Sequence, residues 1–224
     1  MHHLGGFAAA VYILVLPSKP ERWIDALEPG ASPVRLARAR SYLHPFDSLR
    51  GLAAEALLRH ALAEHFGLPD ESVRLFPDEW GKPQLTGHPG IHFNLSHSGP
   101  WVLCAVHHGP VGIDVEEIRP LPMFPAEMVM APDELRTFAG LARSTTVDFF
   151  RLWTIKQSLL KAIGCGLSMD PRFISLDPMA PDSTIQGFPE PGSRWRLVRL
   201  PMPKGVEAAL CCRPSSEHSL RSRP

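Results

Sequence analysis

The sequence has no excess of charge of either sign, because 23 Lys and Arg residues balance 23 Asp and Glu residues. Without a net field, the protein as a whole attracts neither nucleic acid nor an anionic membrane, and any phosphate binding has to come from local basic clusters. Cysteine is scarce too. The four cysteines include no C-x-x-C pair, which indicates reduced thiols in a cytoplasmic protein rather than a disulfide scaffold.

Long apolar runs are also lacking. The longest, "FAAAVYILVL" at residues 7–16, is about half the length of a bilayer span. No Lys or Arg precedes it, and no clear small-residue cleavage site follows it, so a signal peptide is not favoured. We interpret the run as a buried first strand and expect a soluble protein.

The periodicity of the remaining sequence predicts an α+β chain. A basic helical pattern in "SPVRLARARSYLHP" is followed by a strong amphipathic helix that begins near Asp47. Short β-type runs follow in "IHFNLSHSG", "WVLCAVHHG" and "VGIDVEEI". The second half repeats this plan with helices in "PDELRTFAGL" and "TVDFFRLWTIKQSLLKAIG" and strands in "FISLD", "RWRLVRL" and "VEAALCC". Residues 179–192 are predicted to be a surface loop, and residues 214–224 a disordered tail.

Two carboxylates are predicted to share one face of a strand. In "VGIDVEEI", Asp114 and Glu116 alternate with aliphatic residues, so a strand places both acids on the side opposite the aliphatic face. Adjacent carboxylates repel each other, and a hard cation such as Mg²⁺ would relieve this by taking an oxygen from each. An ordinary solvated strand face is the alternative, and taken alone it is the more common arrangement.

The helix "LWTIKQSLLKAIG" carries polar groups on an otherwise apolar pattern. Trp153, Gln157 and Lys161 recur every four residues and therefore share one stripe. Lys156 lies about a quarter-turn away, among apolar positions. Exposed lysines usually only solubilise a helix, but a half-buried lysine requires an anionic partner.

The run "FNLSHS" offers a serine beside a histidine. Asn94, Ser96 and His97 are candidates to face a cleft, and Ser96 with His97 suggests a hydrolase. This reading is weak, because strand neighbours point to opposite faces and the sequence contains no G-x-S-x-G elbow. The histidines here also lack the spacing of a zinc site.

Taken together, the clusters suit a polyphosphate with magnesium. "RLARAR", "GKP", "FNLSHSG", "GIDVE", W-x-x-K-x-x-x-x-K and G-x-G-L-S follow one another over residues 32–168. This order and spacing resemble the 4′-phosphopantetheinyl transferase family, of the surfactin-synthetase-activating type.

The resemblance implies a pseudo-twofold arrangement of two similar α+β half-domains, each with a small antiparallel sheet packed on a long helix. The first half, residues 1–110, would be the nucleotide side for coenzyme A. The second, residues 111–213, would carry the metal and the lysine helix.

The activity implied is transfer of 4′-phosphopantetheine from coenzyme A, the co-substrate, to a serine of an apo carrier protein, with release of adenosine 3′,5′-bisphosphate. The family acts on acyl or peptidyl carrier proteins of fatty acid, polyketide and nonribosomal peptide synthesis, with Mg²⁺ as the usual ion. We expect a cytoplasmic monomer with no nucleic-acid or membrane partner.

Site residues carry over by position in the motifs. Asp114 and Glu116 match the metal-binding carboxylates, and Lys161 matches the lysine on the pyrophosphate, with Lys156 contributing to the same field. For the nucleotide and its phosphates, the resemblance implies Ser96, His97, Arg35, Arg38 and Arg50, together with Lys82 and Pro83 of the "GKP" loop. His97 also counts among the catalytic candidates.

One position departs from the family pattern. The family usually has W-x-x-K-E, and its glutamate is regarded as a metal ligand and the likely base toward the carrier serine; here the residue is Gln157. A glutamine carbonyl can still ligate magnesium, but it has no usable basicity. Either Glu116 or a metal-bound hydroxide then accepts the proton, or transfer is slower, or the chain is a homologue that only binds coenzyme A or the carrier. We favour a working transferase.

Overall fold

The computed structural model describes residues 2–3, 9–77, 83–121, 126–140, 146–176, 182–186 and 188–213. The chain divides into two compact units, Met1–Gly109 and Pro110–Pro224. Each unit contains a four-stranded antiparallel sheet with a long helix packed against it. The prediction of an α+β fold with two halves of this kind is confirmed.

The sheet of the first unit has the strand order β1-β2-β6-β5, with every neighbouring pair antiparallel. Its strands are β1 (His2–His3), β2 (Ala10–Val15), β5 (His92–Ser98) and β6 (Trp101–His107). The central β6 is buried from Val102 to His107. β2 covers residues 10–15 of the apolar run that was predicted to be a buried first strand. It is the second strand, after β1, and only its first half is buried, whereas Leu14 and Val15 are exposed.

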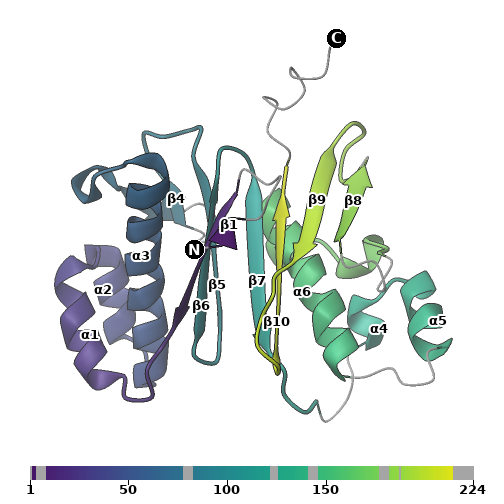
Figure 1. Ribbon diagram of the computed structural model, residues 1–224, viewed down its shortest axis with the longest axis horizontal. Helices are drawn as coiled ribbons and strands as arrows, with labels where there is room; N and C mark the ends of the chain where they lie inside the picture. The colour runs from purple at the N-terminus through teal and green to yellow at the C-terminus, as the bar shows by residue number, and fades with distance from the viewer. Residues whose placement is uncertain are drawn as a thin grey trace. The chain divides into compact units, whose positions relative to one another are not determined.

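The long helix of the first unit is α3 (Pro45–Phe66), which packs on β6, β5 and β2. Proline at the first turn and Gly67 in the left-handed region, with φ 66°, bound this helix as helix-end chemistry predicts. Two shorter helices, α1 (Glu21–Leu27) and α2 (Pro33–Arg40), pack against α3 (Figure 1). The 3₁₀ turns η1 (Glu28–Gly30) and η2 (Asp70–Ser72) and the two-stranded pair β3 (Leu75–Pro77) and β4 (Pro83–Leu85) complete the unit.

The sheet of the second unit has the order β7-β10-β9-β8, again antiparallel throughout. Its strands are β7 (Val111–Glu117), β8 (Asp182–Gln186), β9 (Arg194–Arg199) and β10 (Val206–Cys212). β7 and β10 are far apart in sequence but pair along their whole lengths, from Val111 opposite Cys212 to Glu117 opposite Val206.

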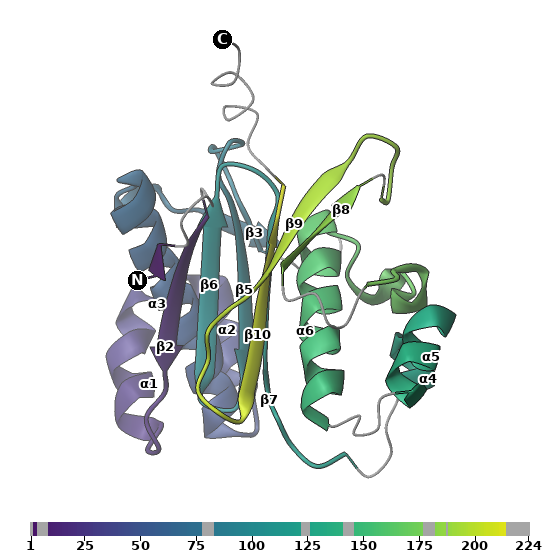
Figure 2. The same ribbon diagram turned by 45° about the vertical axis from the view of Figure 1, so that its right-hand side comes forward.

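The long helix of the second unit is α6 (Thr146–Ile163), which lies along one face of this sheet and contacts β7, β10 and β9 (Figures 1 and 2). The shorter helices are α4 (Ala126–Val129), α5 (Pro132–Gly140) and the 3₁₀ turns η3 (Gly166–Ser168) and η4 (Pro171–Phe173). Figure 2 shows α4 and α5 beside α6, away from the sheet. An apolar cluster that includes Ile155, Leu159, Trp195 and Leu197 joins α6 to β9 and β10.

Two local predictions for the second unit were wrong. "FISLD" was expected to form a strand. Phe173 is instead the last residue of η4, which begins at Pro171 after the capping carboxylate of Asp170, and residues 174–176 belong to no strand. Asp177 lies outside the described residues. Conversely, β8 lies within residues 179–192, which were predicted to be loop; it pairs with β9 although it has only one aliphatic residue. Residues 214–224, the predicted tail, lie outside the described residues.

Candidate functional site

Asp114 and Glu116 lie on the face of β7 that packs on α6. Strand alternation places both acids on the same side as Gly112, and Gly112 is in contact with the α6 backbone. A Cβ on Gly112 would lie 2.0 Å from the backbone O of Ser158 and 2.4 Å from the backbone N of Ala162. Only glycine allows so close an approach, so this residue sets the distance between the acids and the helix.

The ammonium group of Lys161 pairs with the first of these acids. Its Nζ lies 2.6 Å from Oδ1 of Asp114 and donates a second hydrogen bond, of 3.2 Å, to the carbonyl of Ile113. The Lys161 side chain is 27% exposed and that of Asp114 is 7% exposed. This pair therefore joins α6 to β7 while keeping part of the lysine open to a ligand.

The second acid is held by the same helical stripe. The indole Nε1 of Trp153 donates to Oε1 of Glu116 over 3.3 Å. Trp153 and Lys161 thus contact the two acids, and Gln157 lies between them on the stripe, one turn from each. Gln157 is 8% exposed, and its Nε2 has no hydrogen-bond partner among the described residues. Such a buried amide group is suited to a ligand that completes its hydrogen bonding.

Lys156 does not lie beside Asp114 and Glu116, although the sequence motif suggested that it acts with Lys161 on the pyrophosphate. Its side chain is fully buried, and its Nζ donates to Oε2 of Glu134 at 2.5 Å and to the carbonyls of Val129 and Pro171 at 2.8 and 3.0 Å. Three acceptors use all three ammonium protons. Lys156 therefore ties α4, α5 and η4 to α6, and its placement favours a structural role over the predicted catalytic one.

Glu134 is a buried acid that the sequence analysis did not predict. Its side chain is 1% exposed, and besides Lys156 it accepts hydrogen bonds from the backbone N of Ala131 at 2.6 Å and of Leu176 at 2.8 Å. Burial lowers the pKa of Lys156, while the hydrogen bond and the charge of Glu134 oppose that effect. The sequence did hold a signal, because "APDEL" places an acid at the third position of a proline-started helix, where it can cap the helix.

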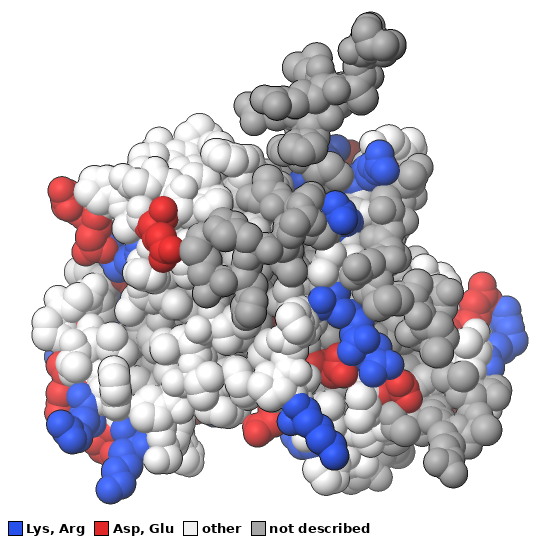
Figure 3. All heavy atoms as spheres, viewed as in Figure 1, with Lys and Arg blue, Asp and Glu red and all other residues white. Residues whose placement is uncertain are grey.

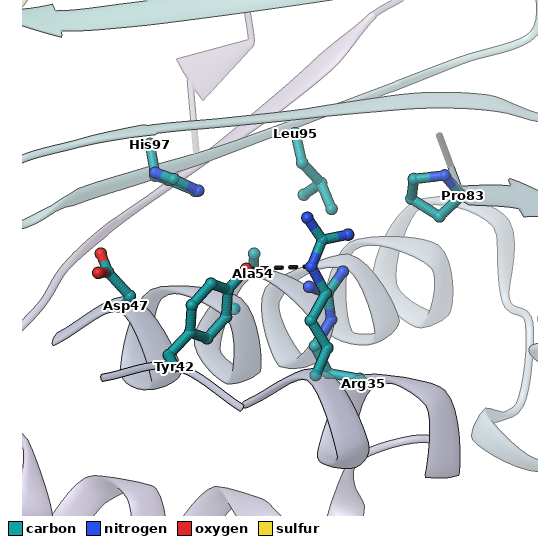
Figure 4. A pocket seen from close by; sticks show the side chains of 9 residues that line it. Arg35, Tyr42, Asp47, Ala54, Pro83, Leu95 and His97 are labelled. Atoms are coloured by element: carbon teal, nitrogen blue, oxygen red, sulfur yellow. Dashed lines mark hydrogen bonds between the residues drawn. The ribbon is translucent and has the colours of Figure 1, made fainter. Parts of the chain in front are cut away.

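A pocket of about 270 Å³ lies in the first unit, among α2, α3, β4 and β5. Figure 4 shows Leu95 and His97 pointing from the strand toward Arg35 and Tyr42 on the helical side. The Nε of Arg38, which also lines the pocket, donates to the hydroxyl of Tyr42 over 3.1 Å (Figure 4). Two guanidinium groups and an imidazole give this pocket the donors that a phosphorylated ligand requires.

Glu55 supports the side of the pocket that carries Arg35. This carboxylate is 2% exposed and accepts hydrogen bonds from the backbone N and the hydroxyl of Ser32, which caps α2, and from Arg59. The Nε of Arg35 lies 3.7 Å from Oε2 of Glu55. The contact limits where the Arg35 guanidinium can move.

Ser96 and His97 occupy opposite faces of β5. His97 is exposed and lines the pocket with Leu95, two residues away, whereas Ser96 is 7% exposed and belongs to the alternate face. A serine and a histidine so placed cannot form a nucleophile and base pair within hydrogen-bond reach. The arrangement argues against the hydrolase reading and brings His97, but not Ser96, to the arginines.

The remaining nucleotide-site candidates differ in position. Arg50 donates to the carbonyl of Gly99 at 2.9 Å and to Oδ1 of Asp47 at 2.6 Å, so Asp47, which lines the pocket, is paired with it. Pro83 also lines the pocket. Lys82 lies outside the described residues. From the sequence, Asp47 was named only as the approximate start of a helix, and Tyr42 was not named at all, so neither was predicted to line a pocket.

The donor set on β7 and α6 fits a hard cation. Asp114, Glu116 and the amide of Gln157 offer oxygens of the kind that Mg²⁺ prefers. Within the described residues, no group of three or more His, Cys, Asp and Glu side chains is placed to hold a metal, so these acids would need water or a ligand to complete the coordination.

On the face drawn in Figure 3, basic and acidic side chains of the described residues are interspersed, and neither sign forms a broad patch there. Within the same residues, no helix has the length and apolar character that crossing a membrane requires.

Both halves of the chain match models of one family. Residues 110–211 match the 4′-phosphopantetheinyl transferase superfamily, and residues 23–109 match the model described as 4′-phosphopantetheinyl transferase, N-terminal.

Individual proteins are similar as well. The chain is 38% identical to 4′-phosphopantetheinyl transferase psf-1 of Bacillus pumilus over 146 residues, which is 65% of this chain and 63% of that protein. It is 33% identical to 4′-phosphopantetheinyl transferase Sfp of Bacillus subtilis over 62% of both chains. The match therefore spans somewhat less than two thirds of the length of these Bacillus relatives. With 4′-phosphopantetheinyl transferase HetI of Nostoc sp., 32% identity extends over 190 residues, 81% of this chain and 78% of that protein. The chain belongs to the 4′-phosphopantetheinyl transferase superfamily.

Proposed function

We propose that the protein transfers the 4′-phosphopantetheine group of coenzyme A to a serine of an apo acyl or peptidyl carrier protein in a Mg²⁺-dependent reaction. The observation that carries this proposal is the pairing of Lys161 on α6 with Asp114 on β7, beside Glu116, in a chain whose two halves both match the family. An ammonium group and two carboxylates at one seam suit a metal diphosphate better than any single charged group would.

Each unit has its own part in this function. The pocket of the first unit, with Arg35, Arg38 and His97, would bind the phosphorylated nucleotide. Pro83 and Lys82 of the "GKP" loop, Arg50 and Ser96 are further candidates for the nucleotide. In the second unit, Lys161 would neutralise the diphosphate. These assignments follow from donor chemistry and from motif positions.

In the reaction, the serine oxygen of the carrier forms a bond to the phosphorus that bears pantetheine. The bond from that phosphorus to the bridging diphosphate oxygen breaks, and adenosine 3′,5′-bisphosphate leaves with the electron pair. Lys161 stabilises the charge that develops on this leaving group. A divalent cation held by Asp114, Glu116 and the Gln157 carbonyl would neutralise further diphosphate charge.

The serine proton needs an acceptor other than residue 157. The amide of Gln157 has no usable basicity, whereas Glu116 has a carboxylate on the same side of β7 as Asp114. We assign Glu116 as the proton acceptor and Gln157 as a group that orients ligand oxygens. Phosphoryl transfer depends mostly on positioning and charge neutralisation, so the reaction tolerates a weak base.

The test is the mass of a carrier protein after incubation with the enzyme, coenzyme A and Mg²⁺. We expect a gain of one phosphopantetheine group, abolished by a chelator and by changing the acceptor serine of the carrier to alanine. No gain with several acyl and peptidyl carriers, despite measurable coenzyme A binding, would overturn the proposal.

Gln157 itself favours a second candidate function, a homologue that binds coenzyme A or a carrier without transfer. The variant Gln157→Glu separates the two. If the chain is a working enzyme, Glu at this position adds a base and raises the transfer rate by about tenfold or more. If neither the chain nor the variant modifies any carrier while both bind coenzyme A, the binding role is the better account.

A further inference from the structure

A third acid lies beside the pair on β7. Glu207 of β10 is the register partner of Glu116, so the two side chains leave the sheet on the same face. Like charges directly opposite each other on neighbouring strands destabilise a sheet. The arrangement persists because other groups compensate the charge of Glu207.

Two arginines provide that compensation. Nη2 of Arg199 on β9 donates to Oε2 of Glu207 at 3.0 Å, and Nη2 of Arg151 on α6 lies 3.7 Å from Oε1 of Glu207. Glu207 is only 8% exposed. The Nε atoms of both arginines are buried and have no hydrogen-bond partner among the described residues. Both guanidinium groups can therefore accommodate a further acceptor.

The same register brings Arg199 toward the acids of β7. Ala209 of β10 pairs with Asp114 on one side and with Arg199 on the other, so these three residues form one row across the sheet. In this row, only the methyl side chain of Ala209 lies between Asp114 and Arg199. Two strand spacings amount to about 10 Å between Cα atoms, which an arginine side chain can largely cross. Glu207, diagonal to Arg199, holds its guanidinium instead.

We propose that Glu207 is a positioning residue that holds the guanidinium group of Arg199 off Asp114 and Glu116, and so prevents this arginine from competing with a divalent cation for the two acids. The inference rests on the proposed function. The positioning role of Glu207 matters more in this chain than it would with a glutamate at position 157. With Gln157 on α6, the two carboxylates of β7 are the acids that attract the cation. An arginine paired with either acid would neutralise half of that negative charge.

The alternative role for Glu207 is direct ligation of the cation. The described residues do not support it, because Asp114, Glu116 and Glu207 form no group placed to hold a metal. The carboxylate of Glu207 is also occupied by arginine. A double variant separates the two roles, since removal of an arginine cannot restore a missing ligand.

The experiment measures Mn²⁺ binding to the full chain by electron paramagnetic resonance, without coenzyme A or carrier. We expect Glu207→Gln to weaken Mn²⁺ binding by about tenfold to a hundredfold, the usual range for residues that support metal ligands. In Glu207→Gln with Arg199→Gln, affinity should return to within about threefold of the parent. Arg151 keeps its own hydrogen bond of 3.0 Å to Asp148 and needs no change.

Glu117→Gln is the matched control, because it removes one negative charge from the exposed neighbour of Glu116. Its Mn²⁺ affinity should stay within about twofold of the parent. Urea midpoints of all variants show whether they are folded. Unchanged Mn²⁺ binding in Glu207→Gln would overturn the inference, as would a double variant that stays as weak as the single one.

The outcome is separable from that of the proposed function. If the parent chain modifies carriers and Glu207→Gln binds Mn²⁺ equally well, only the inference fails. If the parent binds Mn²⁺ with the predicted dependence on Glu207 but modifies no carrier, the proposed transfer fails and the positioning role is retained.

Discussion

The two units build the same architecture but join helix to sheet with different chemistry. In the first unit, α3 packs on β6 through apolar side chains such as Leu58, Leu62, Cys104 and Val106. In the second unit, α6 meets β7 through an ion pair, an indole hydrogen bond and a glycine that admits the helix backbone. The apolar contact between α3 and β6 stabilises the fold. The contact between α6 and β7 also holds charged side chains in positions where they can bind a ligand.

The difference teaches how a helix buried on several sides can carry polar groups. One stripe of α6, with Trp153, Gln157 and Lys161, faces the acids of β7. Another stripe is apolar and packs on β9 and β10. The Lys156 side chain points away from both stripes, toward α4, α5 and η4, and pairs there with Glu134. Burial of a lysine therefore does not reveal its role; its partner does.

The largest effect that would break this comparison is loss of the buried ion pair. Lys156→Gln leaves the carboxylate of Glu134 buried without its partner, which should lower the free energy of unfolding by about 3–5 kcal/mol. Urea denaturation measures the loss. Adding Glu134→Gln removes the unpaired buried charge and keeps an acceptor oxygen for one of the two backbone N–H groups, so it should recover more than about 1 kcal/mol of the loss. A variant as stable as the parent would show that the pair does not hold these elements together.

The same substitution at the other lysine sharpens the comparison. Lys161→Gln should reduce carrier modification by about 10²–10³-fold, because the charge developing on the leaving group loses its cation. Its free energy of unfolding should fall by less than that of Lys156→Gln, because the Lys161 side chain is 27% exposed and water can reach the site, whereas Lys156 is fully buried. If Lys156→Gln and Lys161→Gln affect rate and stability alike, the two lysines do not have separate roles.

Gly112 tests whether the polar seam depends on close packing. In Gly112→Ala the methyl group cannot fit against Ser158 and Ala162, so α6 has to move away from β7. We expect a loss of about 3 kcal/mol in the free energy of unfolding, together with weaker Mn²⁺ binding. The variant Gly30→Ala is the control, because a methyl group there meets no atom within 4 Å. Equal stability of the two variants would contradict the close approach.

The smallest expected effect is a pH dependence of the free energy of unfolding that comes from His107 in the first unit. His107 is 1% exposed, and the backbone N and O of Gly109 both lie 3.0 Å from its Nδ1. Burial lowers the pKa of His107, the hydrogen bond with the backbone of Gly109 opposes this effect, and neighbouring histidines lower the pKa further.

Because the unfolded chain binds a proton near pH 6.5 and the folded one only at lower pH, stability falls as pH drops below about 6.5. The slope from one such group is at most about 1.4 kcal/mol per pH unit. His107→Asn should remove that contribution, as urea midpoints between pH 5 and pH 7.5 would show. An unchanged pH dependence in the variant would contradict a buried neutral His107.

Much of this arrangement follows from the sequence. The alternation around Asp114 and Glu116 predicted their common face, and the period of four predicted the stripe of Trp153, Gln157 and Lys161. Both predictions rest on local geometry that side-chain period alone fixes. The family resemblance is confirmed by matches in both halves.

The rest depends on distant partners that period cannot reveal. Lys156 and Glu134 are 22 residues apart in the chain, so the sequence showed a lysine among apolar residues but not the acid that it meets. Glu207 and the acids of β7 come together only through the pairing of β7 with β10. Strand β8 was missed because neighbours in the sheet, rather than its own residues, determine its conformation.

The most direct test of the central claim is a titration of coenzyme A into the protein with and without Mg²⁺, compared with Asp114→Asn. The account predicts that Mg²⁺ tightens coenzyme A binding by about tenfold or more in the parent chain. In Asp114→Asn this tightening should vanish, while binding without metal persists through the pocket of the first unit. Equal tightening in both proteins, or none in the parent, would contradict a magnesium diphosphate held between β7 and α6.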